Sequence, residues 1–202
     1  MTFLDIEHPM YIPEKLKTFD LSLFHKINGE WHTPFLDNFL PFLREFYLWL
    51  PLYFFLMLFI IINFKMAGWY WALFFIINVS ISDVFSSRVI KELFYRFRPC
   101  HDPAIFDKVR LLTSYCSSTS SFTSSHAVNH FAAAMFIFTT FKKTISRYWG
   151  FLFVWAFIVA YAQVYVGVHF PLDVFCGAIV GMVIGYFVAK VYNKKIGLTT
   201  IT

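Results

Sequence analysis

YLWLPLYFFLMLFIIINF, residues 47–64, carries no charged side chain from end to end. A helix needs roughly 20 apolar residues to cross a hydrocarbon core of about 30 Å, so this stretch predicts a transmembrane helix. A bilayer offers no hydrogen bonds to an open backbone, and the run is too long for a barrel strand. Comparable runs follow at 68–90, 125–141, 148–168 and 171–191. The sequence therefore predicts an all-α integral membrane bundle of five transmembrane helices.

The composition of the whole chain also indicates a membrane protein. Hydrophobic residues make up 58%, aromatic residues 22% and charged residues only 14%, with a mean hydropathy of +0.60. These values exceed those of soluble domains. The 202 residues predict one domain, with an N-terminal interfacial segment at 1–46, a helical core at 47–192 and a cytoplasmic tail at 193–202. The net charge of +5 comes from scattered residues without a sustained basic face, so we expect no nucleic acid partner.

The positions of the lysines predict the orientation. Lys65, the Lys142-Lys143 pair and the Lys194-Lys195 pair fall on one side if the five spans alternate. Positively charged loops stay cytoplasmic, so the opposite side faces outward. We therefore expect a multi-pass protein of the inner (cytoplasmic) membrane, with the 91–124 loop and His169 facing the periplasm or exterior.

Charges and prolines interrupt the first 46 residues too often for a clear span. Leu21, Phe24 and Ile27 alternate with Asp20 and Lys26, which is typical of amphipathic helices in a membrane interface. We expect such helices at the outer interface. The alternative is that this segment contains a sixth transmembrane helix, which would place the N-terminus on the cytoplasmic side.

Cys100 and Cys116 lie in the same predicted outer loop, whereas Cys176 lies within the last span. The first two form a disulfide if the compartment is oxidising, and two free thiols are the alternative. The spacing of Cys and His residues does not indicate a zinc site, and no metal or cofactor is expected.

A polar stripe runs through the second apolar segment. Ser80, Asp83, Ser87 and Lys91 recur at helical intervals, so we expect the stripe to face the interior of the bundle. Ionisable groups in or beside membrane spans are costly to bury, and those that persist mark functional sites. In this position Asp83 either orients the stripe or neutralises Lys91.

Three separated stretches carry the candidate chemistry: Lys91 to Arg98-Pro99, Thr-Ser-Ser-His at 123–126, and Tyr-Val-Gly-Val-His-Phe-Pro-Leu-Asp at 165–173. Together they resemble the three signature motifs of the type-2 phosphatidic acid phosphatase superfamily, in its integral-membrane lipid phosphatase branch. The resemblance implies that His169 becomes a phosphohistidine and that His126 is the general acid.

The residue types fit the same roles. Phosphate hydrolysis without a metal needs a nucleophile, an acid for the leaving oxygen and fixed positive charge around the other oxygens. Asp173, four residues after His169, can reach the imidazole and select its tautomer. The remaining predicted phosphate ligands are Lys91, Arg98, Ser124, Ser125 and Gln163.

Two motifs depart from the family pattern. Thr123 and Ser125 stand where the family usually has Pro and Gly, and Ala162 and Gln163 stand where it has Ser and Arg. Without the guanidinium of that arginine, the site loses charge-assisted hydrogen bonds to phosphate worth roughly 1.5–3 kcal/mol, which weakens catalysis without abolishing it. His130 or an arginine of the outer loop could restore the missing charge.

The predicted function is metal-independent hydrolysis of phosphate from a membrane lipid phosphate or diphosphate, through a phosphohistidine intermediate at the outer membrane face. The resemblance implies substrates such as undecaprenyl diphosphate, phosphatidylglycerol phosphate, phosphatidic acid or lipid A. A noncatalytic lipid-phosphate binding or transport protein with a degraded phosphatase site is the alternative, and a haloperoxidase is a more remote one. The sequence makes no prediction of oligomeric state.

Overall fold

The computed structural model describes residues 9–142 and 150–198, and within these ranges every regular element is helical. This confirms the all-α fold class. In chain order the elements are α1 Glu14–Phe24, the π-helix η2 His25–Glu30, α2 Pro34–Leu43, α3 Phe46–Val84, the π-helix η3 Phe85–Ile90, α4 Lys91–Leu93, the 3₁₀ turns η4 Pro99–His101 and η5 Phe106–Lys108, α5 Ser125–Phe141, α6 Gly150–Tyr165 and α7 Pro171–Lys195.

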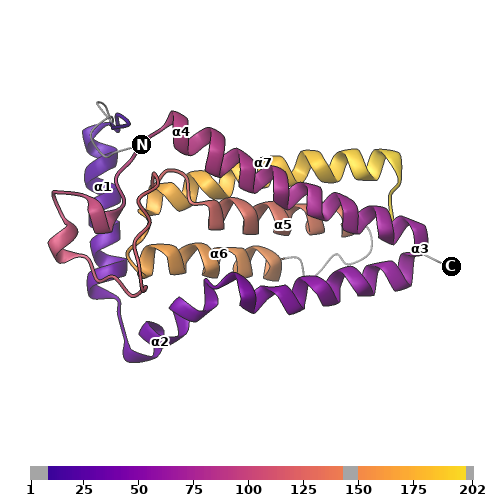
Figure 1. Ribbon diagram of the computed structural model, residues 1–202, viewed down its shortest axis with the longest axis horizontal. Helices are drawn as coiled ribbons and strands as arrows, with labels where there is room; N and C mark the ends of the chain where they lie inside the picture. Colours follow the sequence, from indigo (N-terminus) through magenta and orange to yellow (C-terminus); the bar gives the residue numbers. More distant parts are fainter. Residues whose placement is uncertain (1–8, 143–149, 199–202) are drawn as a thin grey trace.

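Helix α3 reverses direction within its length. Lys65 has non-helical backbone angles, with φ at +49°, and the two halves of α3 run in opposite directions from this point (Figure 1). Gly68 allows this close return, because a Cβ there would lie 2.4 Å from the Ile60 carbonyl oxygen. The apolar runs predicted at 47–64 and 68–90 are therefore two antiparallel helical segments.

The later helices follow the predicted runs closely. α5 has the predicted bounds, and α6 ends three residues before the predicted 168. α7 continues to Lys195, so the first residues of the expected tail are helical. Lys143 and the start of the run at 148–168 lie outside the described residues.

Helices α5 and α7 share the most extensive contact among the described helices, and glycine recurs every fourth residue along α7 at this contact. At Gly181 a Cβ would lie 2.2 Å from the Val128 carbonyl oxygen, and at Gly185 it would lie 2.4 Å from that of Ala132. Small residues of this kind let two membrane helices approach to backbone contact.

Aromatic side chains of α3, α5 and α7 pack together in a second region, which we call the aromatic half of the bundle. The Trp71 ring stacks on Phe75 with centroids 5.3 Å apart and also contacts Phe136. The buried Trp71 indole donates a 2.9 Å hydrogen bond to the Thr140 hydroxyl. This satisfies the polar edge of a large apolar side chain.

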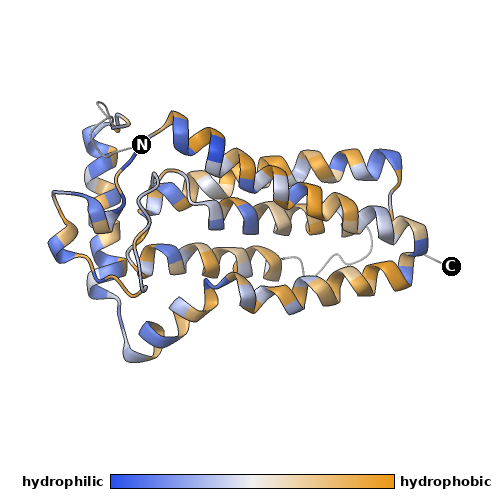
Figure 2. Cartoon of the chain, viewed as in Figure 1, coloured by the Kyte–Doolittle hydropathy of each residue, from blue (hydrophilic) through white to orange (hydrophobic). Residues whose placement is uncertain are grey.

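The bundle has two ends, which we name by their contents (Figure 1). The loop end holds α1 and the connections 94–124 and 166–170. The turn end holds the reversal at Lys65 and the C-terminal end of α7, where the Tyr192 hydroxyl donates to the Ala67 carbonyl. Hydrophilic residues concentrate at the two ends and hydrophobic residues along the helices between them (Figure 2).

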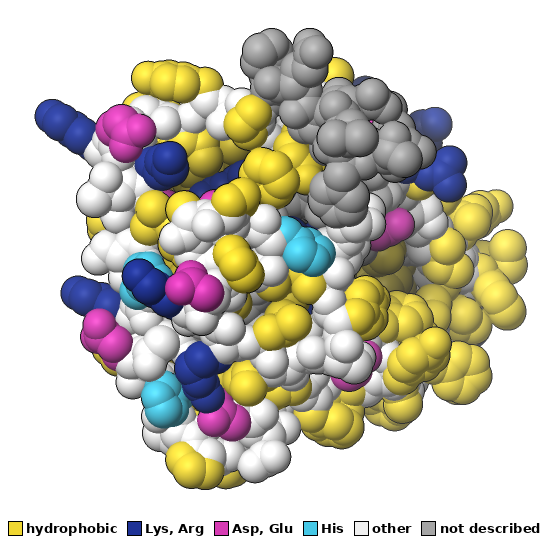
Figure 3. Space-filling model, turned by 60° about the vertical axis from the view of Figure 1, so that its left-hand side comes forward, with side chains coloured by type: hydrophobic (Ala, Val, Ile, Leu, Met, Phe, Trp, Pro, Cys, Tyr) yellow, Lys and Arg dark blue, Asp and Glu magenta, His cyan; other side chains and the backbone are white. Residues whose placement is uncertain are grey.

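Two helical stretches of the described chain are long and apolar enough to cross a membrane, Phe46–Leu93 and Pro171–Lys195, and α6 is a shorter apolar helix. The first stretch counts the two halves of α3 as one. Only 6% of its most apolar window is buried inside the protein, so its large side chains face outward, as lipid-facing residues do. Charged side chains gather over the loop end and apolar ones on the bundle behind it (Figure 3).

The N-terminal segment forms the predicted helices and packs against the loop end. Phe24, Ile27 and Leu40 are buried in a cluster that includes Tyr165 and Phe170. α1 lies across the ends of the bundle helices (Figure 1).

The prediction for the polar stripe of α3 was wrong in its helical phase. Ser80, Asp83 and Ser87 are exposed, and Asp83 accepts a hydrogen bond from the Asn129 amide at the edge of α5. The buried face instead contains a second polar series, Asn78, Ser82 and Ser86. This series continues the apolar face of Trp71 and Phe75, which fixes the side of the helix that faces the bundle.

Candidate active site

His169 lies in the short connection that leads into α7, and the start of that helix holds its partner. Pro171 occupies the first turn, and the Asp173 carboxylate accepts a 2.9 Å hydrogen bond from the Phe170 backbone N–H. This cap fixes the chain on both sides of His169. His169 and Asp173 are both buried.

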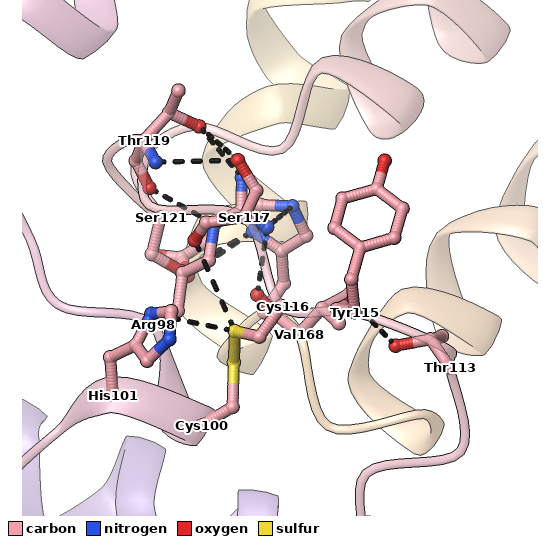
Figure 4. The surroundings of a disulfide bond; sticks show 12 residues. Arg98, Cys100, His101, Thr113, Tyr115, Cys116, Ser117, Thr119, Ser121 and Val168 are labelled. Atoms are coloured by element: carbon pink, nitrogen blue, oxygen red, sulfur yellow. Dashed lines mark hydrogen bonds and ion pairs between the residues drawn. A yellow bond between two sulfur atoms is a disulfide. The ribbon is translucent and has the colours of Figure 1, made fainter.

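Arg98 contacts Nε2 of the His169 ring, which we call its outer nitrogen. Its guanidinium lies 3.3 Å from His169 Nε2 and donates to the Val168 carbonyl at 3.2 Å and to the Thr119 carbonyl at 3.0 Å. Figure 4 shows Arg98 between the 113–121 loop and Val168. Because arginine is always charged, this arrangement supplies fixed positive charge beside the imidazole.

The predicted contact between His169 and Asp173 is indirect. His169 Nδ1 lies 3.6 Å from Asp173 Oδ2, which is too long for a hydrogen bond. The Ser121 hydroxyl lies between them, 3.3 Å from the ring nitrogen, and donates to the carboxylate at 2.5 Å. Ser121 therefore links the two residues.

Burial lowers the pKa of His169 to about 3, and the positive charge of Arg98 acts in the same direction. The nearby Asp173 carboxylate opposes the shift but does not cancel it. The imidazole is therefore neutral at physiological pH, as a nitrogen nucleophile has to be.

The first turn of α5 brings the second motif to the same place. The Ser124 backbone N–H donates to the Asp173 carbonyl at 3.2 Å, which joins the starts of α5 and α7. The Ser125 hydroxyl receives a hydrogen bond from Ser86 of η3. The hydroxyls of Thr123 and Ser124 are buried without a partner. The start of α5 thus offers free donors beside the His169 connection.

His126 and Lys91 lie within electrostatic reach of the other site residues. His126 interacts with the charges at His169 and Lys91, and Lys91 interacts with those of Arg98 and Asp173. Both side chains are partly exposed. The three predicted motifs therefore converge at the loop end.

Gln163 stands inside the protein without a partner. Its side-chain oxygen and nitrogen are both buried and unbonded, and its carbonyl accepts from the backbone N–H groups of Val168 and His169. His130, the other predicted source of charge, packs against Trp155 at 5.0 Å between ring centroids, with its Nδ1 3.0 Å from the His126 carbonyl. Its environment is therefore largely aromatic.

Two arginines near the site were not singled out by the sequence analysis. Arg96 is buried and forms ion pairs with Asp173 at 2.7 Å and with Asp20. Arg44, at the end of α2, places its charge within reach of Arg98 and His126. No local pattern marks either residue, because the groups that bring them to the site, Asp20 and Asp173 for Arg96 and Arg98 and His126 for Arg44, are distant in the sequence.

A disulfide joins Cys100 to Cys116, with 6.5 Å between their Cα atoms (Figure 4). It connects the turn after Arg98 to the loop that carries Thr119. His101 Nδ1 lies 3.6 Å from Cys116 Sγ, and these three residues form a cluster with metal-ligand atoms. Both sulfurs are held in the disulfide, so they are not available as thiolate ligands in this form.

The fold and the site define an all-helical membrane protein with two histidines and several fixed cations gathered at one end of the bundle. The family model described as PAP2 superfamily matches residues 69–196. The chain belongs to the PAP2 superfamily, and it is a lipid phosphate hydrolase.

A relative and two solved structures agree with this membership. The chain is 32% identical over 177 residues to a lipid A 4'-phosphatase of Porphyromonas gingivalis, covering 85% of this chain and 72% of the relative. It resembles the crystal structure of Aquifex aeolicus LpxE at 28% identity and a TM-score of 0.64, over 85% of this chain and 95% of that one. It also resembles the crystal structure of the transmembrane PAP2 type phosphatidylglycerolphosphate phosphatase of Bacillus subtilis. The identity is 22% and the TM-score is 0.65, over 91% of this chain and 89% of that one.

Proposed function

We propose that this protein hydrolyses a phosphate monoester of lipid A or of a closely similar phosphorylated glycolipid. We also propose that the chain crosses the inner membrane five times, with the loop end at the outer face. The observation that carries the chemistry is the neutral, buried His169 with Arg98 at its outer nitrogen. The choice of lipid rests on similarity to a lipid A 4'-phosphatase. The five crossings are the two halves of α3 and helices α5, α6 and α7.

The reaction we propose has two steps. His169 Nε2 forms a bond to phosphorus while the bond from phosphorus to the sugar oxygen breaks, and His126 gives that oxygen a proton. Water then attacks the phosphohistidine, His126 accepts the proton, and the nitrogen–phosphorus bond breaks to release phosphate. Lys91, Arg98 and the donors of Ser124 and Ser125 stabilise the charged oxygens, and Gln163 provides a neutral ligand.

The test is phosphate release from lipid A bisphosphate in mixed micelles with a chelator present throughout. Phosphatidic acid, phosphatidylglycerol phosphate and undecaprenyl diphosphate serve as competing substrates. We expect the highest kcat/KM with lipid A and no release by His169→Ala. Short reaction times with labelled substrate should trap an acid-labile, base-stable phosphoenzyme in wild type, and His169→Ala should form none. Release that survives His169→Ala would contradict the mechanism.

The unpaired Gln163 favours one other function, a noncatalytic lipid-phosphate binding or transport protein. That function requires lipid binding without release of phosphate from any lipid of the panel. The fixed His169, Ser121 and Asp173 arrangement favours the enzyme, because binding alone requires no oriented nucleophile.

A further inference from the structure

Behind His169, a series of buried polar groups continues away from the phosphate side and ends on α1. It passes from His169 to Ser121, Asp173, Arg96 and finally Asp20. These five residues come from four separate stretches of chain, and all five are buried. Burying three ionised groups is costly, so the arrangement requires close pairing throughout.

The first link determines the tautomer of His169. The Ser121 hydroxyl has one proton, which it donates to Asp173, so toward His169 Nδ1 it can only accept. The ring proton is therefore on Nδ1, and Nε2 keeps its lone pair. Arg98 donates toward that same nitrogen, which agrees with this assignment. The nucleophilic nitrogen is thus directed at the cationic side of the site.

The second link holds Asp173 in place. Arg96 Nη1 donates to Asp173 Oδ1 at 2.7 Å, and Arg96 Nη2 donates to Asp20. The other Asp20 oxygen accepts from the Leu172 backbone N–H at 2.8 Å, in the first turn of α7. Arg96 also lies 4.0 Å over the centroid of the Phe170 ring. Asp20 thereby fixes both the arginine and the helix start that carries Asp173.

The charges of the network suit the reaction. Asp20 and Asp173 contribute two negative charges and Arg96 one positive charge, so one negative charge remains while His169 is neutral. Attack on phosphorus places positive charge on the imidazole, which this remaining charge stabilises. The guanidinium also restrains the carboxylate from rotating toward solvent, since it bonds one oxygen of each acid.

We propose that Ser121, Arg96 and Asp20 are positioning residues for the nucleophile, with Ser121 fixing the tautomer of His169 and the Asp20–Arg96 pair fixing Asp173. This inference rests on the proposed function of His169. It extends the set of residues that position His169 to the N-terminal helix α1, which carries none of the three motifs.

The test compares Ser121→Ala and Asp20→Asn with two controls. Ser87→Ala removes an exposed serine of η3, and Asp37→Asn breaks an N-terminal carboxylate pair with Arg110 that has no bond to Asp173. We expect kcat to fall roughly ten- to a hundredfold in both test variants, with KM within about threefold and the controls unchanged.

The measurement that separates positioning from a merely structural role is the ¹⁵N spectrum of labelled histidine, assigned with His169→Gln. Wild type should show a protonated Nδ1 and an unprotonated Nε2, and Ser121→Ala should show a mixture of tautomers. An unchanged tautomer in Ser121→Ala would overturn the inference, whether or not kcat falls. If Asp20→Asn does not fold, the neutral Ser121→Ala still decides. An inactive wild type would count against the proposed function alone, because the spectrum is read without turnover.

A separate observation concerns the arginine missing at position 163. Arg44 Nε is buried without a hydrogen-bond partner, and the side chain as a whole is 17% exposed, with Glu45 4.0 Å away as a weak ion pair. The neighbouring Trp49 bonds the Leu43 carbonyl at 2.7 Å and packs on His130, one turn from His126. This contact places the α2–α3 junction beside the second turn of α5.

We infer that Arg44 binds the substrate phosphate and replaces the guanidinium that Gln163 does not provide. This also rests on the proposed function. Positive charge from Arg44 already acts on both Arg98 and His126. An anion between these like charges would relieve their repulsion, and the free Nε–H provides a donor for it.

The test is Arg44→Ala, with exposed Arg88→Ala as the matched control. We expect kcat/KM to fall roughly ten- to a hundredfold and calorimetric binding of inorganic phosphate to weaken by a similar factor. Adding Gln163→Arg to Arg44→Ala should recover most of the loss. Phosphate binding and kcat/KM within twofold of wild type would overturn the inference. Binding is measured without turnover, so it stays decisive for an inactive enzyme.

Discussion

At the loop end, a backbone hydrogen bond joins the starts of α5 and α7, whereas farther along the bundle the same two helices meet through backbone contact and apolar side chains. Ser124 bonds Asp173 at the first place, and Gly181 lies against Val128 at the second. Directional bonds set atomic positions, while apolar packing mainly supplies stability. The comparison teaches that one helix pair separates positioning of the site from support of the fold.

The largest effect should come from Asp173→Ala, which affects both the positioning of the site and the stability of the fold. It removes the acceptor for Ser121 and Phe170 and leaves Arg96 paired with Asp20 alone. We expect activity to fall by more than about a thousandfold and the free energy of unfolding to fall by about 3–5 kcal/mol. Phosphate release from the proposed lipid substrate and denaturant unfolding in micelles measure the two effects. Activity within tenfold of wild type would show that Asp173 does not support the nucleophile.

Gly181→Leu should disrupt the supporting contact. The new side chain would meet the Val128 backbone, whose position is fixed within α5, so the helices have to separate. We expect a loss of roughly 3 kcal/mol or more, seen as a lower melting temperature and aggregation on size exclusion. Gly150→Leu is the control, because no atom lies within 4 Å of a Cβ at that position. Equal melting temperatures for the two variants would refute this account of the packing.

The pH dependence of stability should report the buried His169. Its pKa is about 3 in the folded protein because of burial, against about 6.5 when unfolded, so the unfolded state binds more protons between these values. Stability should therefore decrease as pH falls from about 6.5, and change little for this reason above it. Melting curves of wild type and His169→Gln between pH 7 and 4 measure the difference. Parallel curves would mean that His169 has an ordinary pKa.

The smallest effect should come from Thr140→Val in the aromatic half. This variant removes the acceptor of the Trp71 indole while keeping the shape of the side chain. We expect a cost of about 1 kcal/mol and unchanged kcat, because no site residue contacts this pair. A loss of activity larger than the loss of folded protein would argue that the two halves are coupled.

Much of the fold could be predicted from the sequence because membrane helices are defined by length and hydropathy. The runs at 47–64 and 125–141 became helical segments with nearly the same bounds. Burial of the Ser80, Asp83 and Ser87 stripe was predicted wrongly, since polar residues recur on two faces of α3. Phe75 and Trp71 mark the buried face, and their phase matches Asn78 and Ser82.

The convergence of the three motifs at the loop end could also be predicted from the sequence, because their spacing is local and characteristic. The contacts of Ser121, Arg96 and Asp20 could not, because their partners lie far away in the chain. The charge of Arg96, for example, is neutralised by acids 76 and 77 positions distant. Pairing of this kind depends on topology, which no local pattern encodes.

The pairing of Asp20 with Arg96 and with the first turn of α7 also bears on biosynthesis. Asp20 leaves the ribosome early, whereas Leu172 and Asp173 emerge with the last helix. A nascent chain therefore lacks the closed ionic network until translation and insertion are nearly complete. Hydrolytic activity should consequently begin only after the final helix has been inserted, so that unfinished chains do not attack lipids during their own synthesis.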